Sequence, residues 1–365
     1  MLVVAVLGGV LLRPGGEGSP LVTSAYAIAE AEYPEMAPYP NEMEFVDEKT
    51  GEFDNDAFRK VYDTWWEDQK AQRRPEGYAG GLEGFFAASI QEFLSGAEGE
   101  NKVYSPVNVY MALAMLAELT DGNSRQQILD LLGSGSIEAL RAQAGDVWNA
   151  NYRNDGATTC VLASSVWLNE NVSFVQKTMD TLARNYYASS YQGEMGSEEF
   201  NRALQNWLNE QTGGLLEEQA GQITMDPDTI LALATTIYFR ATWTNEFSES
   251  RTEPDVFHAA VGDVTCDFMH QSGSKTYYWG DNFSAVAQGF ENIGGSMWFI
   301  LPDEGVSVDE LLRDEQTLEF LLADGEWENS KYLIVNLSVP KFDVTSQMEL
   351  GEGLRALGVT DVFDY

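Results

Sequence analysis

The sequence predicts an α+β fold. Helical patterns fill the first part of the main body, at residues 82–131, and runs of β-branched and aromatic residues dominate from residue 159 onward. Because strands and helices do not alternate regularly, this order disfavours a doubly wound nucleotide-binding sheet. The chain has 365 residues, of which 44% are hydrophobic, so it can bury one large core or two smaller ones.

Helices open the main body. A capping hydroxyl at Ser105 precedes Pro106 at the first position of a helix that extends to Leu119 and is apolar on most faces. Such a helix lies inside a core. Further helices are predicted after Ser124 and around residues 200–215. The helix before Ser105 has apolar residues at helical spacing, at Leu82, Phe85, Phe86, Ile90, Phe93 and Leu94.

Strands follow. Thr159–Leu168 is rich in Thr, Val and Leu. Thr229–Trp243 is apolar on both alternating faces, which predicts a central strand covered on both sides. Ala285–Phe290 and Met297–Leu301 flank a pair of glycines and predict a hairpin. Leu333–Val339 alternates again, and a last helix carries Met348, Leu350, Leu354 and Leu357.

Residues 1–29 have the pattern of a secretory leader. Leu2–Leu12 is apolar and too short to span a bilayer of ~30 Å comfortably as a helix. Small-residue motifs follow at Ala25-Tyr26-Ala27 and Ala27-Ile28-Ala29, as in a signal-peptide cleavage zone. A positively charged start is missing, so an uncleaved apolar terminus is the alternative. We expect a secreted, extracellular protein that is not attached to a membrane after signal cleavage.

Residues 30–80 read as an acidic linker or extension with one short helix. The segment holds 14 acidic and 6 basic residues and four prolines. Its helix carries an aromatic stripe that we expect to dock on the main body, because exposed tryptophans are costly; a partner-binding stripe is the alternative. The stripe consists of Phe58, Val61, Tyr62, Trp65 and Trp66.

The formal net charge is −37, from 58 acidic and 21 basic residues. A surface of this sign repels phosphate backbones and anionic lipids. Nucleic acid, heparin-like polyanions and acidic membranes are therefore disfavoured as partners. Only Arg125 and Arg141 are positive near residues 126–144, so no heparin-type basic helix is expected.

Residues suited to catalysis or metal binding are few. Cys160 and Cys266 lack C-x-x-C spacing; one disulfide is possible, and two buried free thiols fit better. His258 and His270 are expected to be structural. No metalloprotease, Walker, nucleophile-elbow or dinucleotide motif occurs. We therefore expect no enzyme, no metal site and no cofactor, although a Ser/His/Asp site assembled from distant residues stays open.

Eight short runs, in order, resemble the serpin family, whose inhibitory members block serine-type or papain-like proteases. Each run is weak by itself, but their order and spacing from about residue 81 to the last residue are specific. They are Asn101-Lys102-Val103-Tyr104-Ser105-Pro106 with Ala112-Leu113-Ala114-Met115, Gly122 to Ile128, Asn206-Trp207 with Thr212 and Gly214, Ile237-Tyr238-Phe239-Arg240 with Trp243 and Phe247, Phe257 with Met269, Phe299-Ile300-Leu301-Pro302, Val339-Pro340-Lys341-Phe342, and Leu357-Gly358-Val359-Thr360-Asp361-Val362-Phe363.

The resemblance implies a serpin domain over residues 81–365, with three β-sheets and about nine helices. It also implies a monomer that acts as a suicide substrate: a protease attacks a reactive loop, which then inserts as an extra strand into a metastable central sheet. The expected partners are serine proteases of the trypsin, chymotrypsin or subtilisin class, with papain-like proteases as the second class.

The resemblance also assigns roles to single residues. Ser105 matches a serine of the polar "shutter" beneath the central sheet. Asn108 stands where the family has a second serine, and Thr235 where it has an asparagine. Trp243 matches the tryptophan at the top of the sheet, and Lys341 belongs to the motif that we place there with it. Without the resemblance, each would be read as ordinary core polarity or packing.

The family's hinge, reactive loop and last strands would follow Phe363, so we expect the reactive bond to lie beyond Tyr365. The chain as given would then lack the C-terminal strands and the reactive loop that a protease attacks. Two other functions stay open. One is a non-inhibitory binding protein or inactive remnant with the same fold, which the hinge sequence would distinguish. The other is an unrelated secreted hydrolase, which would need an intact catalytic set.

Overall fold

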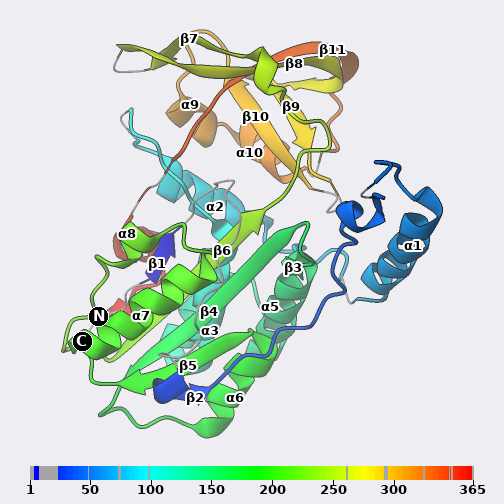
Figure 1. Ribbon diagram of the computed structural model, residues 1–365. Coiled ribbons are helices and arrows are strands. Elements are labelled where there is room, and N and C mark those ends of the chain that lie inside the picture. The colour runs from blue at the N-terminus through cyan, green and yellow to red at the C-terminus, as the bar shows by residue number, and fades with distance from the viewer. Residues whose placement is uncertain are drawn as a thin grey trace.

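The computed structural model describes residues 4–7, 24–47, 49–72, 75–97, 99–259, 262–291, 295–323, 325–344, 346 and 348–363. Two sheets organise these residues, with most helices packed around one of them (Figure 1). None of the helices in the described part is both long and apolar enough to cross a membrane.

The central sheet has strand order β1-β6-β4-β5-β2, and the short β3 also pairs with β4. β6 runs antiparallel to β4 over ten residue pairs, whereas β1 and β5 lie parallel to their neighbours β6 and β4. The strands are β1 (Val4–Leu7), β2 (Ala27–Ala29), β3 (Arg153–Asn154), β4 (Thr159–Asn169), β5 (Ala188–Gly193) and β6 (Leu231–Arg240).

Helices cover both faces of the central sheet, with α7 in front and α3 behind (Figure 1). The α3 side forms the larger core, built on α3 because ten of its fourteen residues are buried. The α7 side packs Phe200, Leu204 and Leu208 on Trp167 and Ala234. The helices of this half are α2 (Glu83–Leu94), α3 (Pro106–Leu119), α4 (Gly122–Leu131), α5 (Ile137–Asn151), α6 (Gln176–Asn185), α7 (Glu198–Gln211), α8 (Glu217–Ala220) and α11 (Gly351–Ala356).

The outer sheet has strand order β10-β9-β8-β11, with β7 also paired to β8. Two short helices, α9 (Val308–Arg313) and α10 (Glu315–Leu322), pack on it through a small core around Phe283 and Phe320. The strands are β7 (Thr252–Ala259), β8 (Gly262–Trp279), β9 (Phe283–Gly289), β10 (Ser296–Pro302) and β11 (Ser330–Pro340).

The sheet count differs from the expected three: the described residues form two. β8 is 18 residues long and unbroken; it pairs with β7 at its start, β11 along most of its length and β9 at its end. What would be counted as a second and a third sheet is therefore one continuous sheet. Within the described part of residues 81–365 there are ten α-helices, α2 to α11, close to the expected number of about nine.

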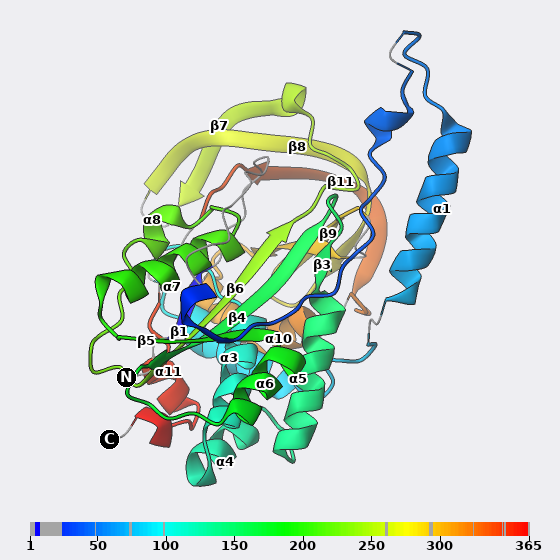
Figure 2. The ribbon, with the colours of Figure 1, turned by 60° about the horizontal axis from the view of Figure 1, so that its bottom comes forward.

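The acidic extension stands beside the body as an arm (Figure 2). It contains η2 (Glu42–Phe45) and α1 (Asn55–Ala71), which is longer than the single short helix predicted. The expected docking of the aromatic stripe on the body is correct only in part. Trp65 is buried and meets Arg153 of the body, but Trp66 is 41% exposed. Phe58 and Tyr62 pack against the extension's own aromatic rings, Tyr39, Phe45 and Phe53, and Val61 is 46% exposed.

The predicted leader lies only partly within the described residues. Of Leu2–Leu12, the structure describes Val4–Leu7, as β1, and the remainder lies outside. The expected cleavage zone coincides with η1 (Ser24–Tyr26) and β2, which pairs antiparallel with β5. The boundaries at residues 29 and 80 stay predictions.

Candidate functional site

Three of the sequence-predicted site residues come together where the start of α3 meets β6. Ser105 caps α3, and its Oγ accepts a hydrogen bond of 3.3 Å from the Asn108 N–H. Thr235 Oγ1 donates to the backbone carbonyl of Asn108 over 3.5 Å. Asn108 and Thr235 are 2% and 1% exposed. The cluster is therefore buried between the largest core helix and the central sheet.

This cluster is not fully hydrogen-bonded. Asn108 Oδ1 is buried and has no partner among the described residues. Two further buried hydroxyls of the sheet, on Ser190 and Thr236, are equally unpaired. A buried polar atom without a partner costs about 1–3 kcal/mol. Such a site is stabilised by any change that supplies a partner.

The sequence analysis missed Ser190 and Thr236. The available signal was the doublets Ser164-Ser165, Ser189-Ser190 and Thr235-Thr236, each in a strand that is otherwise mostly apolar. In a buried strand, adjacent hydroxyls point to opposite faces. In the β4–β6 register, Ser164 lies opposite Thr235 and Ala163 opposite Thr236. The doublets therefore place hydroxyls on both covered faces of the central sheet.

The cluster lies beside a thinly occupied strand edge. One edge of β6 pairs with β4 over Leu231–Arg240. The other edge pairs only with β1, over Leu233–Thr236, within the described part of the chain. The backbone groups of residues 237–240 on that edge have no strand partner there. An edge of this kind can accept another extended segment through main-chain hydrogen bonds.

Trp243 and Lys341 lie away from the polar cluster. Trp243 follows the end of β6, where it forms a bridge with Phe290 and stacks on that ring at 4.7 Å. It thereby connects the two sheets. Lys341 follows β11. Its backbone N–H donates to the backbone carbonyl of Asp267 over 2.8 Å, and its side chain is exposed. The structure thus separates the five residues into one buried cluster and two positions at strand ends.

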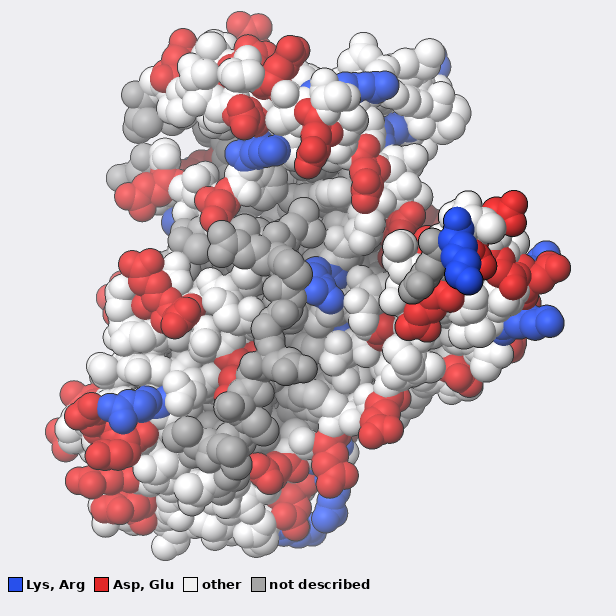
Figure 3. Space-filling model, viewed as in Figure 1, with Lys and Arg blue, Asp and Glu red and all other residues white. Residues whose placement is uncertain are grey.

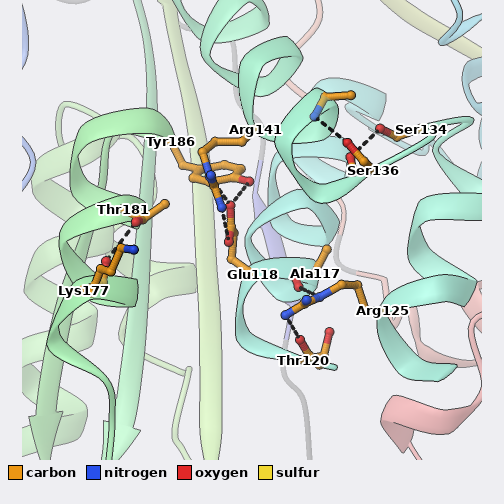
Figure 4. A network of polar contacts seen from close by, with 11 residues as sticks. Ala117, Glu118, Thr120, Arg125, Ser134, Ser136, Arg141, Lys177, Thr181 and Tyr186 are labelled. Atoms are coloured by element: carbon orange, nitrogen blue, oxygen red, sulfur yellow. Dashed lines mark hydrogen bonds and ion pairs between the residues drawn. The ribbon is translucent and has the colours of Figure 1, made fainter. Parts of the chain in front are cut away.

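A charged network fixes the other end of α3 (Figure 4). Arg141 of α5 donates to both Glu118 oxygens, at 2.6 and 3.0 Å, and Tyr186 after α6 donates to Glu118 at 2.8 Å. The hydrogen bond with Glu118 raises the pKa of Arg141, and burial raises the pKa of Tyr186. Arg125 donates to the α3 carbonyls of Ala117 and Thr120. This network joins three helices and leaves no free nucleophile.

The histidines do not build a catalytic site. His270 Nδ1 lies 2.8 Å from Ser338 Oγ, and its Nε2 lies 3.8 Å from the Glu253 carboxylate. That carboxylate is beyond hydrogen-bond reach and 76% exposed, so it cannot orient the ring as a triad acid does. His258 is paired with Asp263 at 2.7 Å on the surface. The hydrolase alternative gains no support from this geometry.

The thiols and acidic groups also lack a reactive arrangement. Both cysteines are free and half-buried, and burial raises the pKa of Cys160 to about 11, so its thiol stays protonated at neutral pH. Within the described ranges, no group of three or more His, Cys, Asp or Glu residues could hold a metal ion.

The comparisons with known proteins agree with this picture. The family model described as Serpin (serine protease inhibitor) matches residues 83–365. Serpin-ZX of Arabidopsis thaliana is 26% identical over 278 residues, covering 73% of this chain and 71% of the relative. Serpin-Z2B of Oryza sativa subsp. japonica is 25% identical over 323 residues, covering 79% and 77%.

Solved structures show the same fold. The thermophilic serpin tengpin in its native state matches with a TM-score of 0.71 and 23% identity, covering 80% of this chain and 74% of that one. Ovalbumin from emu (Dromaius novaehollandiae) matches with a TM-score of 0.71 and 18% identity, covering 79% of each. The family model covers most of the sequence and the α+β architecture agrees with it, so this chain belongs to the serpin family.

Proposed function

We propose that this chain is the body of an inhibitor of serine-type endopeptidases that acts as a suicide substrate, its reactive loop entering the central sheet beside β6. The observation that carries the proposal is the sparsely paired edge of β6 next to the incompletely hydrogen-bonded cluster of Asn108 and Thr235. Papain-like cysteine proteases are the second target class. Family membership supports an inhibitor over an enzyme.

The physical argument concerns the energy of the starting state. Each buried polar atom without a partner raises the free energy of the native sheet. A strand that enters beside β6 would satisfy the main-chain groups of residues 237–240 and would replace β1 opposite Thr235. Insertion would therefore release free energy, which can be used to displace and distort a protease attached to the loop.

The surface charge defines the partners in this proposal. Asp and Glu side chains are spread over the outer sheet, the extension and the α7 side (Figure 3). With a net charge of −37, a monomer that meets proteases without nucleic acid or heparin-like cofactors is the expected mode of action. In this proposal the protein works outside the cell.

The test is a covalent complex. The product of the whole reading frame that contains residues 1–365 is incubated with trypsin-, chymotrypsin-, subtilisin- and papain-like proteases and run on a denaturing gel. We expect an SDS-resistant band at the summed mass with at least one serine protease, and none when that protease's nucleophile is blocked beforehand. Cleavage or indifference across the panel would instead support a non-inhibitory serpin-fold protein.

Export is a separate proposal with a separate test. We infer that a signal peptidase cleaves after Ala27 or Ala29, in the zone that forms β2 in the folded chain. Because a protease needs an extended, accessible substrate, cleavage would precede the pairing of β2 with β5 and would leave at most residues 28–29 of β2 in the mature chain. Mass spectrometry of the N-terminus of secreted material should begin at residue 28 or 30. Protein retained in cells with residues 1–27 intact would contradict export.

A further inference from the structure

Three aromatic side chains form a cradle on the outside of the body. Trp148 of α5 and Tyr152, the residue that follows α5, lie one turn apart and stack at 4.4 Å, and Tyr187 stacks on Trp148 at 3.5 Å. Tyr33 of the acidic extension lies against all three rings, at 5.3 Å from Trp148, 5.7 Å from Tyr152 and 6.4 Å from Tyr187. Burial raises the pKa of Tyr33, as expected for a ring enclosed in this way.

Residues 27–39, here called the strap, contact the body along a continuous path past β5 and β3 (Figure 2). β2 pairs with the outer edge of β5, and the Ala31 N–H donates to Ser189 Oγ over 3.1 Å. Tyr152 donates to the Pro34 carbonyl over 3.3 Å, and the Tyr39 N–H donates to the Asp155 carbonyl over 2.7 Å. Most of these hydrogen bonds use the strap's backbone, and Tyr33 and Met36 are side chains that anchor it, since Met36 Sδ accepts from the Asn154 N–H over 2.9 Å.

The cradle includes a strained residue. Among the described residues, Tyr187 is the only non-glycine with a positive φ, +50°. That conformation costs roughly 1–2 kcal/mol for a residue with a Cβ. Its ring is held by Trp148 and Tyr33, and its hydroxyl donates to Asn149 over 3.3 Å. Because Tyr187 is the turn between α6 and β5, the rings that hold it also fix where β5 begins.

The neighbouring residue clamps the same turn from inside. Tyr186 donates to Glu118, which Arg141 also binds. Two sets of contacts therefore hold the turn. The inner clamp is the network of Tyr186, Glu118 and Arg141 within the body, and the outer clamp is the packing of Tyr187 against Trp148 and against Tyr33 of the strap. Only the outer clamp can be opened without breaking the core, since Tyr33 is half-buried and Tyr186 is fully buried.

We propose that the cradle is a peptide-binding surface whose ligand is this chain's own strap, and that the seated strap holds the α6–β5 turn and restrains β5. The ligand class is an extended acidic segment that runs past β5 and presents one tyrosine to the cradle. Release of the strap lets Tyr187 relax and frees the outer edge of the central sheet. This inference does not depend on inhibition of a protease.

The first test separates the strap from the body after folding. A specific protease site is inserted between the exposed residues Glu76 and Gly77 of the full chain, and the folded protein is cut there. We expect residues 1–76 to co-elute with the body in gel filtration. Tyr33→Ala should weaken this retention at least tenfold, and a synthetic peptide of residues 27–40 should compete with the strap for the cradle. Met43→Ala, at a site 74% exposed in the same extension, is the matched control.

The second test reads the turn directly in the uncut full chain. Tyr33→Ala should speed amide hydrogen exchange in β5 at least tenfold, whereas Met43→Ala and the ring-preserving Tyr33→Phe should leave it unchanged. If Tyr33→Ala fails to fold, Tyr33→Leu replaces it. Equal retention and equal β5 exchange in the Tyr33 and Met43 variants would overturn the proposal, as would a peptide that does not compete at millimolar concentration.

Discussion

The central and outer sheets differ in how completely they are covered. In β4 every residue from Leu162 to Leu168 is buried, because α3 lies on one face and α7 on the other. In β11 only Val339 is buried, and Tyr332 and Ile334 are 71% and 77% exposed. Two strands of equal length thus occupy opposite environments in one protein.

The difference in coverage shows which sheet contributes most to stability and which sheet has a surface free to contact a partner. A strand buried on both faces resists change of side-chain volume, whereas a strand with exposed apolar residues is free to contact another surface. Yet the central sheet also contains the unpaired polar atoms of Asn108, Ser190 and Thr236. The best-covered region therefore still contains unsatisfied polar atoms, as β8 of the outer sheet does at His270 and Gln271.

Alkaline pH should destabilise the central half of the molecule. Burial raises the pKa of Tyr110 and Tyr186, both fully buried on the α3 side. Below the unfolded-state pKa near 10 this has no effect; above it the unfolded chain loses protons that the folded chain keeps, so stability falls as pH rises. Each such tyrosine contributes about 1.4 kcal/mol per pH unit. Urea unfolding at pH 9, 10 and 11 measures the slope.

A phenylalanine substitution gives the control for that experiment. Tyr110→Phe keeps the ring and removes one ionisable group, so the loss of stability between pH 10 and 11 should become smaller by about 1 kcal/mol. An unchanged slope in this variant would mean that Tyr110 does not resist ionisation in the folded state.

A matched pair of truncations compares the sheets directly. Trp167 of β4 is fully buried and donates to Ser165 over 2.9 Å, so Trp167→Ala should reduce the free energy of unfolding by about 3–5 kcal/mol. Tyr332→Ala in β11 should change it by less than about 0.5 kcal/mol. Chemical denaturation of both variants tests this. Comparable losses would show that the outer sheet is as tightly packed as the central one.

The charged network at the end of α3 gives a smaller effect. Glu118→Gln removes the charge that Arg141 and Tyr186 share, while the glutamate side chain is only 7% exposed. We expect a loss of about 1–3 kcal/mol in the free energy of unfolding. The exposed pair of Arg202 and Glu198 is the control, and Arg202→Gln should cost less than about 1 kcal/mol. Equal losses would mean that Glu118 is hydrated in solution.

Periodicity predicted the elements of the central half well. The apolar helix after Ser105 and the two-faced strand within Thr229–Trp243 were recognisable because burial on all sides removes polar residues from a sequence. The outer sheet was harder. β8 contains mostly polar residues, since much of it is exposed, and no apolar pattern revealed that one strand joins all parts of that sheet.

The site was predictable only through the family resemblance. Ser105, Asn108 and Thr235 are ordinary polar residues in their sequence context, and only the structure shows them in contact. Tyr33 was missed entirely, because it lies in a proline-rich acidic segment with no helical or strand period. A periodic sequence pattern shows which face of a helix or strand is buried. The cradle instead depends on single side chains from distant segments that the fold brings together, and no pattern marks them.

The smallest expected effect is the most informative about the polar cluster. Thr235 Oγ1 lies 3.5 Å from the Asn108 carbonyl, at the outer limit of a hydrogen bond. Thr235→Val should therefore change the free energy of unfolding by less than about 1 kcal/mol, no more than Thr242→Val at an exposed site just after β6. A loss above about 2 kcal/mol would identify the hydroxyl as a structural bond of the native sheet. A small loss fits a hydroxyl that is held weakly in the native state and is available for a new partner when the strands beside it move.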